Sequence, residues 1–263
     1  MIYLSLNIQS FSNSPNIPNS PKTTLPKTTL PKTTLPKMHL PEIVVGPGGV
    51  CGFYSLGICH YVVNHFEIKD KNIVGFSAGA FNTLFMRLVP EKRNKLLQDI
   101  FECDERNTIH ILKRIMDIVE TTTELKDYDL NTTSIAVSHP EGISLYDTFL
   151  TIEQLGRCCK SSSFIPFVTY ETGIDFYNHK IALDGYFYYK SFLSQYPERP
   201  LVISPFMFGR YSNTIVHKLK FIFGMHALKT TSIYQMYLYG YQDAKKNHSL
   251  FEKYLNPLHK VLI

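Results

Sequence analysis

Ser77 stands between two glycines directly after a hydrophobic segment. It is the central residue of the pentapeptide 75–79 (GFSAG), in which Gly75 and Gly79 flank it, and the short apolar segment 72–74 precedes the motif. A serine hydroxyl can attack an ester when it projects from a sharp strand-to-helix turn, and flanking glycines allow the backbone to make that turn. The pattern predicts a nucleophile elbow for acyl transfer. The alternative is a tight turn whose serine has no chemical role.

A glycine-rich segment, residues 46–52, precedes the serine motif by one predicted strand–helix unit. It follows an apolar segment and opens a predicted helix, so its backbone N–H groups lack helical partners and lie at the positive end of a helix dipole. Such donors stabilise the oxyanion that forms during acyl transfer. Residues 46–52 can supply such donors.

The same glycines partly match two nucleotide-binding patterns. A phosphate-binding P-loop needs a Gly-Lys-Ser/Thr sequence, which this segment lacks. A loose dinucleotide-binding pattern is present at Gly46, Gly48 and Gly52. However, the next predicted strand ends in Ser77 instead of the acidic residue that binds a ribose. Nucleotide binding is therefore a minor alternative.

An acid in the second half of the chain is placed to serve as the general base. The predicted strand 180–183 runs into Asp184 and Gly185, which puts a carboxylate at a strand end beside a residue that turns freely. Asp-Gly is also a common turn pair without chemistry. Asp175, in a more polar stretch, is the competing candidate.

In this order, the glycine loop, the serine motif and the Asp-Gly pair resemble the patatin-like phospholipase family over about residues 43–205. The segment 161–167 also looks like the small-residue and proline segment that precedes the Asp strand in that family. The resemblance implies a three-layer αβα sandwich with a mostly parallel central sheet. It also implies a lipid acyl hydrolase with Ser77 as nucleophile, Asp184 as base, and Gly48, Gly49 and Val50 as oxyanion-loop residues. No metal or cofactor is implied, and the substrates would be phospholipids or acylglycerols.

Three positions depart from the family pattern. Pro47 stands at the first position of the loop, Cys51 stands where a basic residue is expected, and Tyr186 follows the Asp-Gly pair in place of a small residue. The serine, the aspartate and the central glycines are retained, so the departures bear on substrate orientation and rate. They leave open a catalytically weak or inactive module that binds lipid or protein.

A second alternative is an α/β-hydrolase esterase with a Ser-Asp-His triad. Its members follow one another in that chain order, and four C-terminal histidines are available: His217, His226, His248 and His259. None of them has a turn-like glycine context, and the glycine loop lies only one βα unit before the serine. Both features favour a dyad without histidine.

The elements that must position these residues follow from apolar periodicity. Strands are predicted at 42–45, 72–75 and 133–137, and helices at 53–66, 78–89, 91–101 and 109–119. This alternation predicts an α/β domain with a mostly parallel sheet and helices on both faces. Ligands of such sheets bind at the carboxyl ends of the strands, where Gly48 and Ser77 both fall.

The C-terminal segment 206–263 is predicted to be a helical extension packed on the domain. Its tyrosines also fit an interfacial helix at a lipid boundary. The spacing of Tyr234, Tyr237 and Tyr241 is that of an ordinary core-facing helix, so packing is the preferred interpretation.

Charge and hydropathy exclude several classes of protein. The chain has 263 residues, 44% of them apolar, and no run near the roughly 18 residues that cross a bilayer. Its net charge is +5, but four of the lysines lie in the first 40 residues, which hold no acid, and without them the charge is +1. Nucleic-acid binding is therefore not expected, because it needs basic residues concentrated on one face.

Cysteine usage bears on the cellular compartment. The five cysteines form no C-x-x-C pair: Cys51, Cys59, Cys103, Cys158 and Cys159. An odd number without metal-binding spacing indicates reduced thiols, as in the cytoplasm. The resemblance, through its lipid substrates, adds the expectation of peripheral contact at membranes.

Residues 21–35 are three consecutive copies of Pro-Lys-Thr-Thr-Leu. Proline at every fifth position blocks both helix and sheet, so residues 1–40 are predicted to be a disordered leader. It is interpreted as a low-complexity tract without a dedicated role, with a docking segment or anionic-surface tether as the alternative. The first residues lack the basic and apolar regions of a signal peptide.

Overall fold

The computed structural model describes residues 40–102, 108–196, 198–211 and 232–258. Apart from Leu40, the predicted leader lies outside these ranges. Four residues named above also lie outside them: Cys103, His217, His226 and His259.

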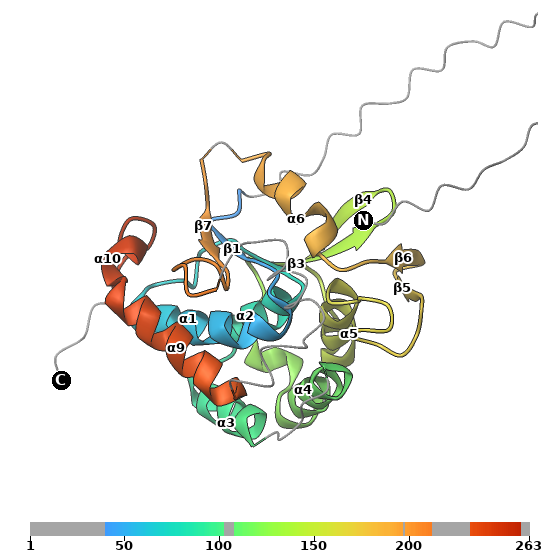
Figure 1. Ribbon diagram of the computed structural model, residues 1–263, viewed down its shortest axis with the longest axis horizontal. Helices are drawn as coiled ribbons and strands as arrows, with labels where there is room; N and C mark the ends of the chain where they lie inside the picture. The colour runs from blue at the N-terminus through green and yellow to red at the C-terminus, as the bar shows by residue number, and fades with distance from the viewer. Residues whose placement is uncertain (1–39, 103–107, 197, 212–231, 259–263) are drawn as a thin grey trace, which may run out of the picture. The chain divides into compact units, whose positions relative to one another are not determined.

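A five-stranded sheet forms the centre of the described part of the chain (Figure 1). Its order is β4-β3-β2-β1-β7. The strands are β1 (Ile43–Val45), β2 (Ile73–Phe76), β3 (Thr133–His139), β4 (Gly142–Tyr146) and β7 (Leu201–Ile203). Strands β3, β2, β1 and β7 are parallel, and β4 pairs antiparallel with β3 at the edge. The predicted α/β class with a mostly parallel sheet is confirmed.

The parallel strands are short apolar runs because both faces of the sheet are buried. Side chains alternate between the faces, so Ile43 and Val45 join the larger hydrophobic core while Val44 joins a smaller one on the other side. In the smaller core Val44 packs with Phe76 and with Phe192 of α6 (Tyr186–Leu193). The register pairs Val45 with Gly75, which brings the carboxyl ends of β1 and β2 to the same edge.

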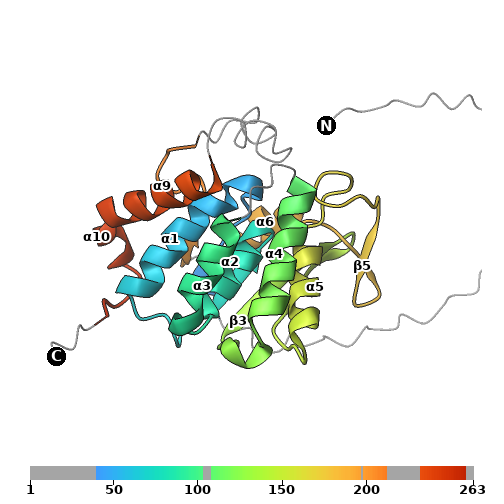
Figure 2. The same cartoon turned by 90° about the horizontal axis from the view of Figure 1, so that it is seen from below.

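Helices form unequal layers on the two faces (Figures 1 and 2). Among the described elements, α6 covers one face, and the remaining longer helices lie on the other. These are α1 (Gly52–His65), α2 (Ala78–Arg87), α3 (Pro90–Phe101), α4 (Thr108–Thr122), α5 (Ile152–Ser162) and α9 (Ile233–Lys246). The arrangement is consistent with a three-layer sandwich whose second helical layer is thin.

Four shorter elements complete the described fold. They are η1 (Gly49–Cys51), η2 (Leu125–Asp127), the hairpin β5 (Asp175–Tyr177) with β6 (Lys180–Ala182), and α10 (His248–Phe251). The predicted strand before Asp184 thus belongs to a separate two-stranded sheet. A bridge between Leu183 and Ser138 attaches this hairpin to β3.

The C-terminal helix α9 lies along α1 and belongs to the same compact unit as the sheet. Asp243 of α9 accepts a hydrogen bond of 2.8 Å from the Tyr54 hydroxyl of α1, and the Arg210 guanidinium binds both of its carboxylate oxygens. Of the three tyrosines predicted to face the core, Tyr237 is buried and Tyr241 is half-buried, whereas Tyr234 is 49% exposed, so the prediction was wrong for Tyr234. No helix in the described ranges combines the length and apolarity needed to cross a membrane.

Candidate active site

Ser77 lies at the turn between β2 and α2, in a strained backbone conformation. Its φ is 55° and its ψ is −128°, a combination that residues other than glycine rarely adopt. A side chain at Gly79 would overlap the carbonyl oxygen of Val45, and a Cβ at Gly75 would lie 2.6 Å from the Thr83 hydroxyl. The two glycines are therefore required for the turn that raises the serine above the sheet edge.

The hydroxyl of Ser77 donates a hydrogen bond of 2.7 Å to Oδ2 of Asp184. The two residues are 107 positions apart in the chain, and both are buried. The other oxygen, Oδ1, accepts a bond of 2.8 Å from the backbone N–H of Tyr186, the first residue of α6. The carboxylate therefore faces the N-terminus of a helix, which favours negative charge.

Burial and hydrogen bonding together set the pKa of the Asp184 carboxyl. Burial raises the pKa of its carboxyl to about 6, against the opposing effect of the hydrogen bonds from Ser77 and the Tyr186 amide. A general base works best when its pKa lies near the operating pH, and this pKa leaves Asp184 ionised at neutral pH. The carboxylate is thus both ionised and in contact with the proton that it would remove.

Asp175, the competing acid, is engaged elsewhere. Its carboxylate accepts hydrogen bonds from the Arg157 guanidinium and, at 2.8 Å, from the Ser161 hydroxyl. Both partners come from α5, so Asp175 fastens the β5–β6 hairpin to that helix. The structure therefore brings Asp184 to Ser77 and gives Asp175 a structural role.

The glycine loop lies at the carboxyl end of β1, beside the elbow. Gly49 has a φ of 51°, and Gly49 and Val50 belong to the first turn of η1, whose N–H groups have no acceptor within the helix. Both residues line the same cavity as Ser77, whereas Gly48 does not and would bring a Cβ to within 2.8 Å of Pro205. Of the three predicted oxyanion residues, Gly49 and Val50 thus line the cavity that Ser77 also lines.

Two of the departures from the family pattern are explained by their surroundings. The side chain of Cys51 is fully buried, and burial raises the pKa of its thiol far above the ordinary value, so a charged residue would not fit there. Only the backbone N–H of Tyr186 touches Asp184, and its side chain is partly exposed. A small residue is not required at that position.

Ser162, at the end of α5, connects both halves of the site. Its hydroxyl accepts the N–H of Ser77 at 2.8 Å and donates to the carbonyl of Ala136 at 2.7 Å. Its own carbonyl accepts the N–H of Gly185 at 2.8 Å. Ser162 therefore holds the backbone of both Ser77 and Gly185. The sequence indicated only a run of small residues here.

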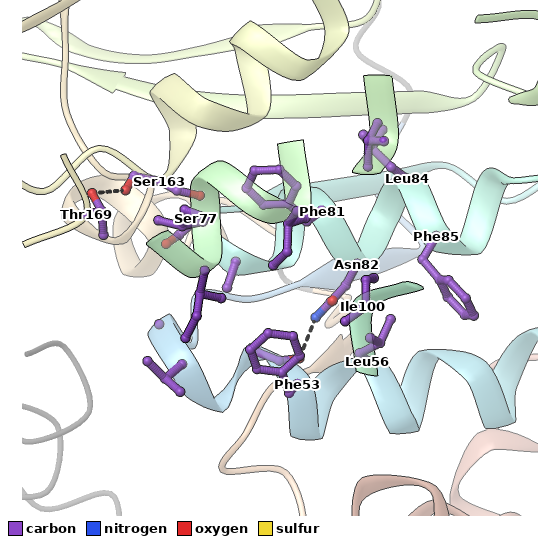
Figure 3. Close-up of a pocket in the computed structure, with 18 of the residues that line it drawn as sticks. Phe53, Leu56, Ser77, Phe81, Asn82, Leu84, Phe85, Ile100, Ser163 and Thr169 are labelled. Carbon is purple, nitrogen blue, oxygen red and sulfur yellow. Dashed lines mark hydrogen bonds between the residues drawn. The ribbon is translucent and has the colours of Figure 1, made fainter. Parts of the chain in front are cut away.

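An apolar cavity of about 90 Å³ has Ser77 at one end (Figure 3), and Asp184 also lines it. Ser163 and Thr169 lie beside Ser77, and Leu84 and Phe85 lie at the opposite end, two turns along α2. At 1.5 Å per residue, the cavity follows α2 for roughly 10 Å. Its other walls come from α1, α3 and α4: Phe53, Leu56, Leu96, Ile100, Ile111, Leu112, Ile115 and Val119.

The walls of this cavity carry few polar groups. Asn82, one of them, donates a hydrogen bond of 3.0 Å to the carbonyl of Gly52 and so links α2 to the start of α1 (Figure 3). An apolar slot with polar groups gathered at one end suits a ligand with a hydrocarbon chain and a polar reacting group.

Within the described residues, no group of three or more His, Cys, Asp or Glu side chains is placed to hold a metal ion. His248, one of the four candidate triad histidines, bonds to the Tyr61 hydroxyl at 2.8 Å and lies 3.4 Å from Glu252. The other three histidines lie outside the described ranges.

No protein-family model matches this chain, and no curated protein matches it in sequence. Its function is therefore inferred from the chemistry of the site.

We predict that Ser162→Ala lowers kcat for a soluble p-nitrophenyl acyl ester by about tenfold or more, with little change in KM. The substitution leaves the buried N–H of Ser77 without its acceptor, which typically costs 1–3 kcal/mol and here loosens the elbow. Ser161→Ala is the matched control, because this neighbouring buried hydroxyl bonds to Asp175 and not to the elbow. Equal kcat in the two variants, at equal thermal stability, would contradict the role given to Ser162.

Proposed function

We propose that this protein is a serine lipid acyl hydrolase that cleaves fatty-acyl esters through a Ser77–Asp184 dyad. The observation that carries the proposal is the 2.7 Å hydrogen bond between these two buried side chains at the polar end of an apolar cavity. Two polar residues buried in direct contact, one of them in a strained turn, indicate a functional site more than a structural one.

In the proposed acylation step, Asp184 removes the proton of Ser77 as Oγ attacks the ester carbonyl carbon. The carbonyl π-electrons move to oxygen, and the tetrahedral oxyanion accepts hydrogen bonds from the N–H groups of Gly49 and Val50. Collapse of this intermediate expels the alcohol, which takes the proton from Asp184. Each oxyanion donor of this kind typically contributes about 2.7–4 kcal/mol to lowering the barrier.

In the proposed deacylation step, water replaces the alcohol. Asp184 removes a proton from the water as its oxygen attacks the acyl-enzyme, and the second tetrahedral intermediate uses the same two amides. Collapse releases the fatty acid, and the proton returns from Asp184 to Ser77. The helix α6 N-terminus and the Tyr186 amide keep the carboxylate in place through both steps.

The shape of the cavity supports an acyl ester as substrate. Its apolar walls extend along α2 away from the dyad, so an acyl chain lying in it brings its carboxyl end to Ser77. A straight hydrocarbon chain fits this arrangement, and a charged or highly hydroxylated ligand does not. Phospholipids and acylglycerols both provide such chains.

We further propose that the architecture is patatin-like. Support comes from the mostly parallel sheet, the order of glycine loop, elbow and Asp-Gly pair, and the direct contact between serine and aspartate. This contact occupies the position that a histidine would hold in a Ser-Asp-His triad, and so it favours the dyad. A location in the cytoplasm is part of the same proposal and rests on the cysteine pattern. Peripheral contact at membranes is also proposed and rests on the proposed lipid substrate.

We predict that Ser77→Ala and Asp184→Asn each abolish hydrolysis of p-nitrophenyl acyl esters while the proteins stay folded. Either change removes one side of the proton transfer. Asp175→Asn is the matched control, because it neutralises a second buried acid that has no contact with Ser77. Loss of activity in Asp175→Asn together with full activity in Asp184→Asn would reassign the base, and activity retained in Ser77→Ala would refute the nucleophile.

We predict that log kcat/KM rises with pH to about pH 6 and is level above it, because Asp184 must be ionised to act. The folded pKa is raised above the ordinary value of about 3.9, so the protonated form favours folding. This contribution, roughly 2–3 kcal/mol, is fully present below about pH 4 and is lost as pH rises through about 6. Stability measured against pH in wild type and Asp184→Asn assigns the ionisation, since the variant should lack it. A rate that stays level down to pH 4.5 would contradict the shifted pKa.

A further inference from the structure

Several large apolar side chains between residues 167 and 181 are exposed to solvent. Phe167 is 73% exposed, Ile174 61%, Phe176 57% and Ile181 41%. Single exposed apolar residues are ordinary on protein surfaces, but a contiguous group is not. These four residues are called the rim patch below.

The loop that carries Phe167 is held in shape by its own hydrogen bonds. The N–H of Ile165 donates to the Thr169 hydroxyl at 2.8 Å, and that hydroxyl donates to the carbonyl of Ser163 at 2.8 Å. The N–H of Val168 donates to the carbonyl of Ile165 at 3.1 Å. Phe167 has a φ of 58°, which is unfavourable for a bulky residue. An ordered loop thus holds a strained aromatic residue out in solvent.

The four side chains form one continuous surface. The ring of Phe167 lies against Gly173, where an added Cβ would be 2.9 Å from its Cζ atom, and Ile174 follows directly. Ile174 and Phe176 are two positions apart in an extended segment, so they point to the same side. Phe176 pairs across the hairpin with Ile181, and the intervening Asp175 points inward.

The rim patch adjoins residues that line the cavity. Ile165 and Thr169, on either side of Phe167 in the loop, both line the cavity, and Ile165 is only partly buried. The other end of the patch, at Ile181, is three residues before Asp184. The hairpin β5–β6 lies next to α5 (Figure 1).

We propose that the rim patch docks this protein on the surface of a lipid aggregate, so that an acyl chain passes into the cavity without crossing water. The proposal rests on the proposed function, because that function requires a substrate with an acyl chain. Continuity of the patch with the residues that line an apolar cavity favours lipid over a protein partner as the occupant. A protein partner bound there would cover the loop that forms part of the cavity wall.

Charge indicates that the docking is by apolar insertion. Arg157, beside the hairpin, is paired with Asp175, and Lys180 lies 3.5 Å from Glu141. With these cations paired, the patch has little attraction for anionic lipid, and binding should depend on apolar area. We therefore expect binding to uncharged lipid surfaces that persists at high salt.

The test measures co-sedimentation of the full chain with phosphatidylcholine vesicles, which carry no net charge, in low and high salt. The double variant Phe167→Asn, Phe176→Thr removes two rings, and both new residues suit the local backbone. Leu150→Asn is the matched control: Leu150 is 81% exposed, but it precedes α5, whereas the patch follows the other end of that helix. The double variant should bind at least about tenfold less tightly than wild type, and the control should bind equally well.

Activity measurements on soluble and vesicle substrates distinguish failure of the rim-patch proposal from failure of the proposed function. The double variant should keep near-wild-type rates on a soluble p-nitrophenyl ester and lose about tenfold or more on vesicles of phospholipid. Ser77→Ala should bind vesicles like wild type while hydrolysing neither substrate. Equal vesicle binding by wild type and the double variant would overturn the rim patch. Absence of vesicle binding by wild type, with self-association that the variant abolishes, would also overturn it in favour of an interface between copies.

Discussion

The hydrogen bond between Ser77 and Asp184 is the interaction around which the described fold is arranged. It joins the end of a central strand to the start of a helix 107 residues later, inside the protein, where a displaced partner would leave an unsatisfied polar group. Three structural features must be correctly positioned for this hydrogen bond to form. These are the turn of the elbow, the N-terminus of α6 beneath Asp184, and the end of α5, from which Ser162 binds both sides.

Burial has opposite effects on stability and chemistry in this site. It raises the pKa of Asp184, which destabilises the folded protein at neutral pH, and it also gives the carboxylate the basicity that proton transfer needs. The strained φ of Ser77 is a second such feature. Both are tolerated because the surrounding sheet and helices are well packed, with apolar side chains on both faces of the strands.

Local patterns were sufficient to predict the strands β1 to β3, the helices between them and the serine elbow, because these follow from apolar runs and glycines close in sequence. The short strand β7 and the edge strand β4 were not predicted, since their pairing with β1 and β3 is set by contacts far apart in the chain. Ser162 was missed for the same reason. Its partners Ser77 and Gly185 are distant in sequence, and nothing in a run of three serines distinguishes the middle one.

The most direct test of this account is covalent labelling of the full chain with a fluorophosphonate probe, followed by identification of the modified residue by mass spectrometry. Such probes react only with an activated serine hydroxyl. The account predicts one adduct on Ser77 that is lost in Asp184→Asn and retained in Asp175→Asn. An adduct on a different serine, no adduct, or equal labelling of wild type and Asp184→Asn would contradict it.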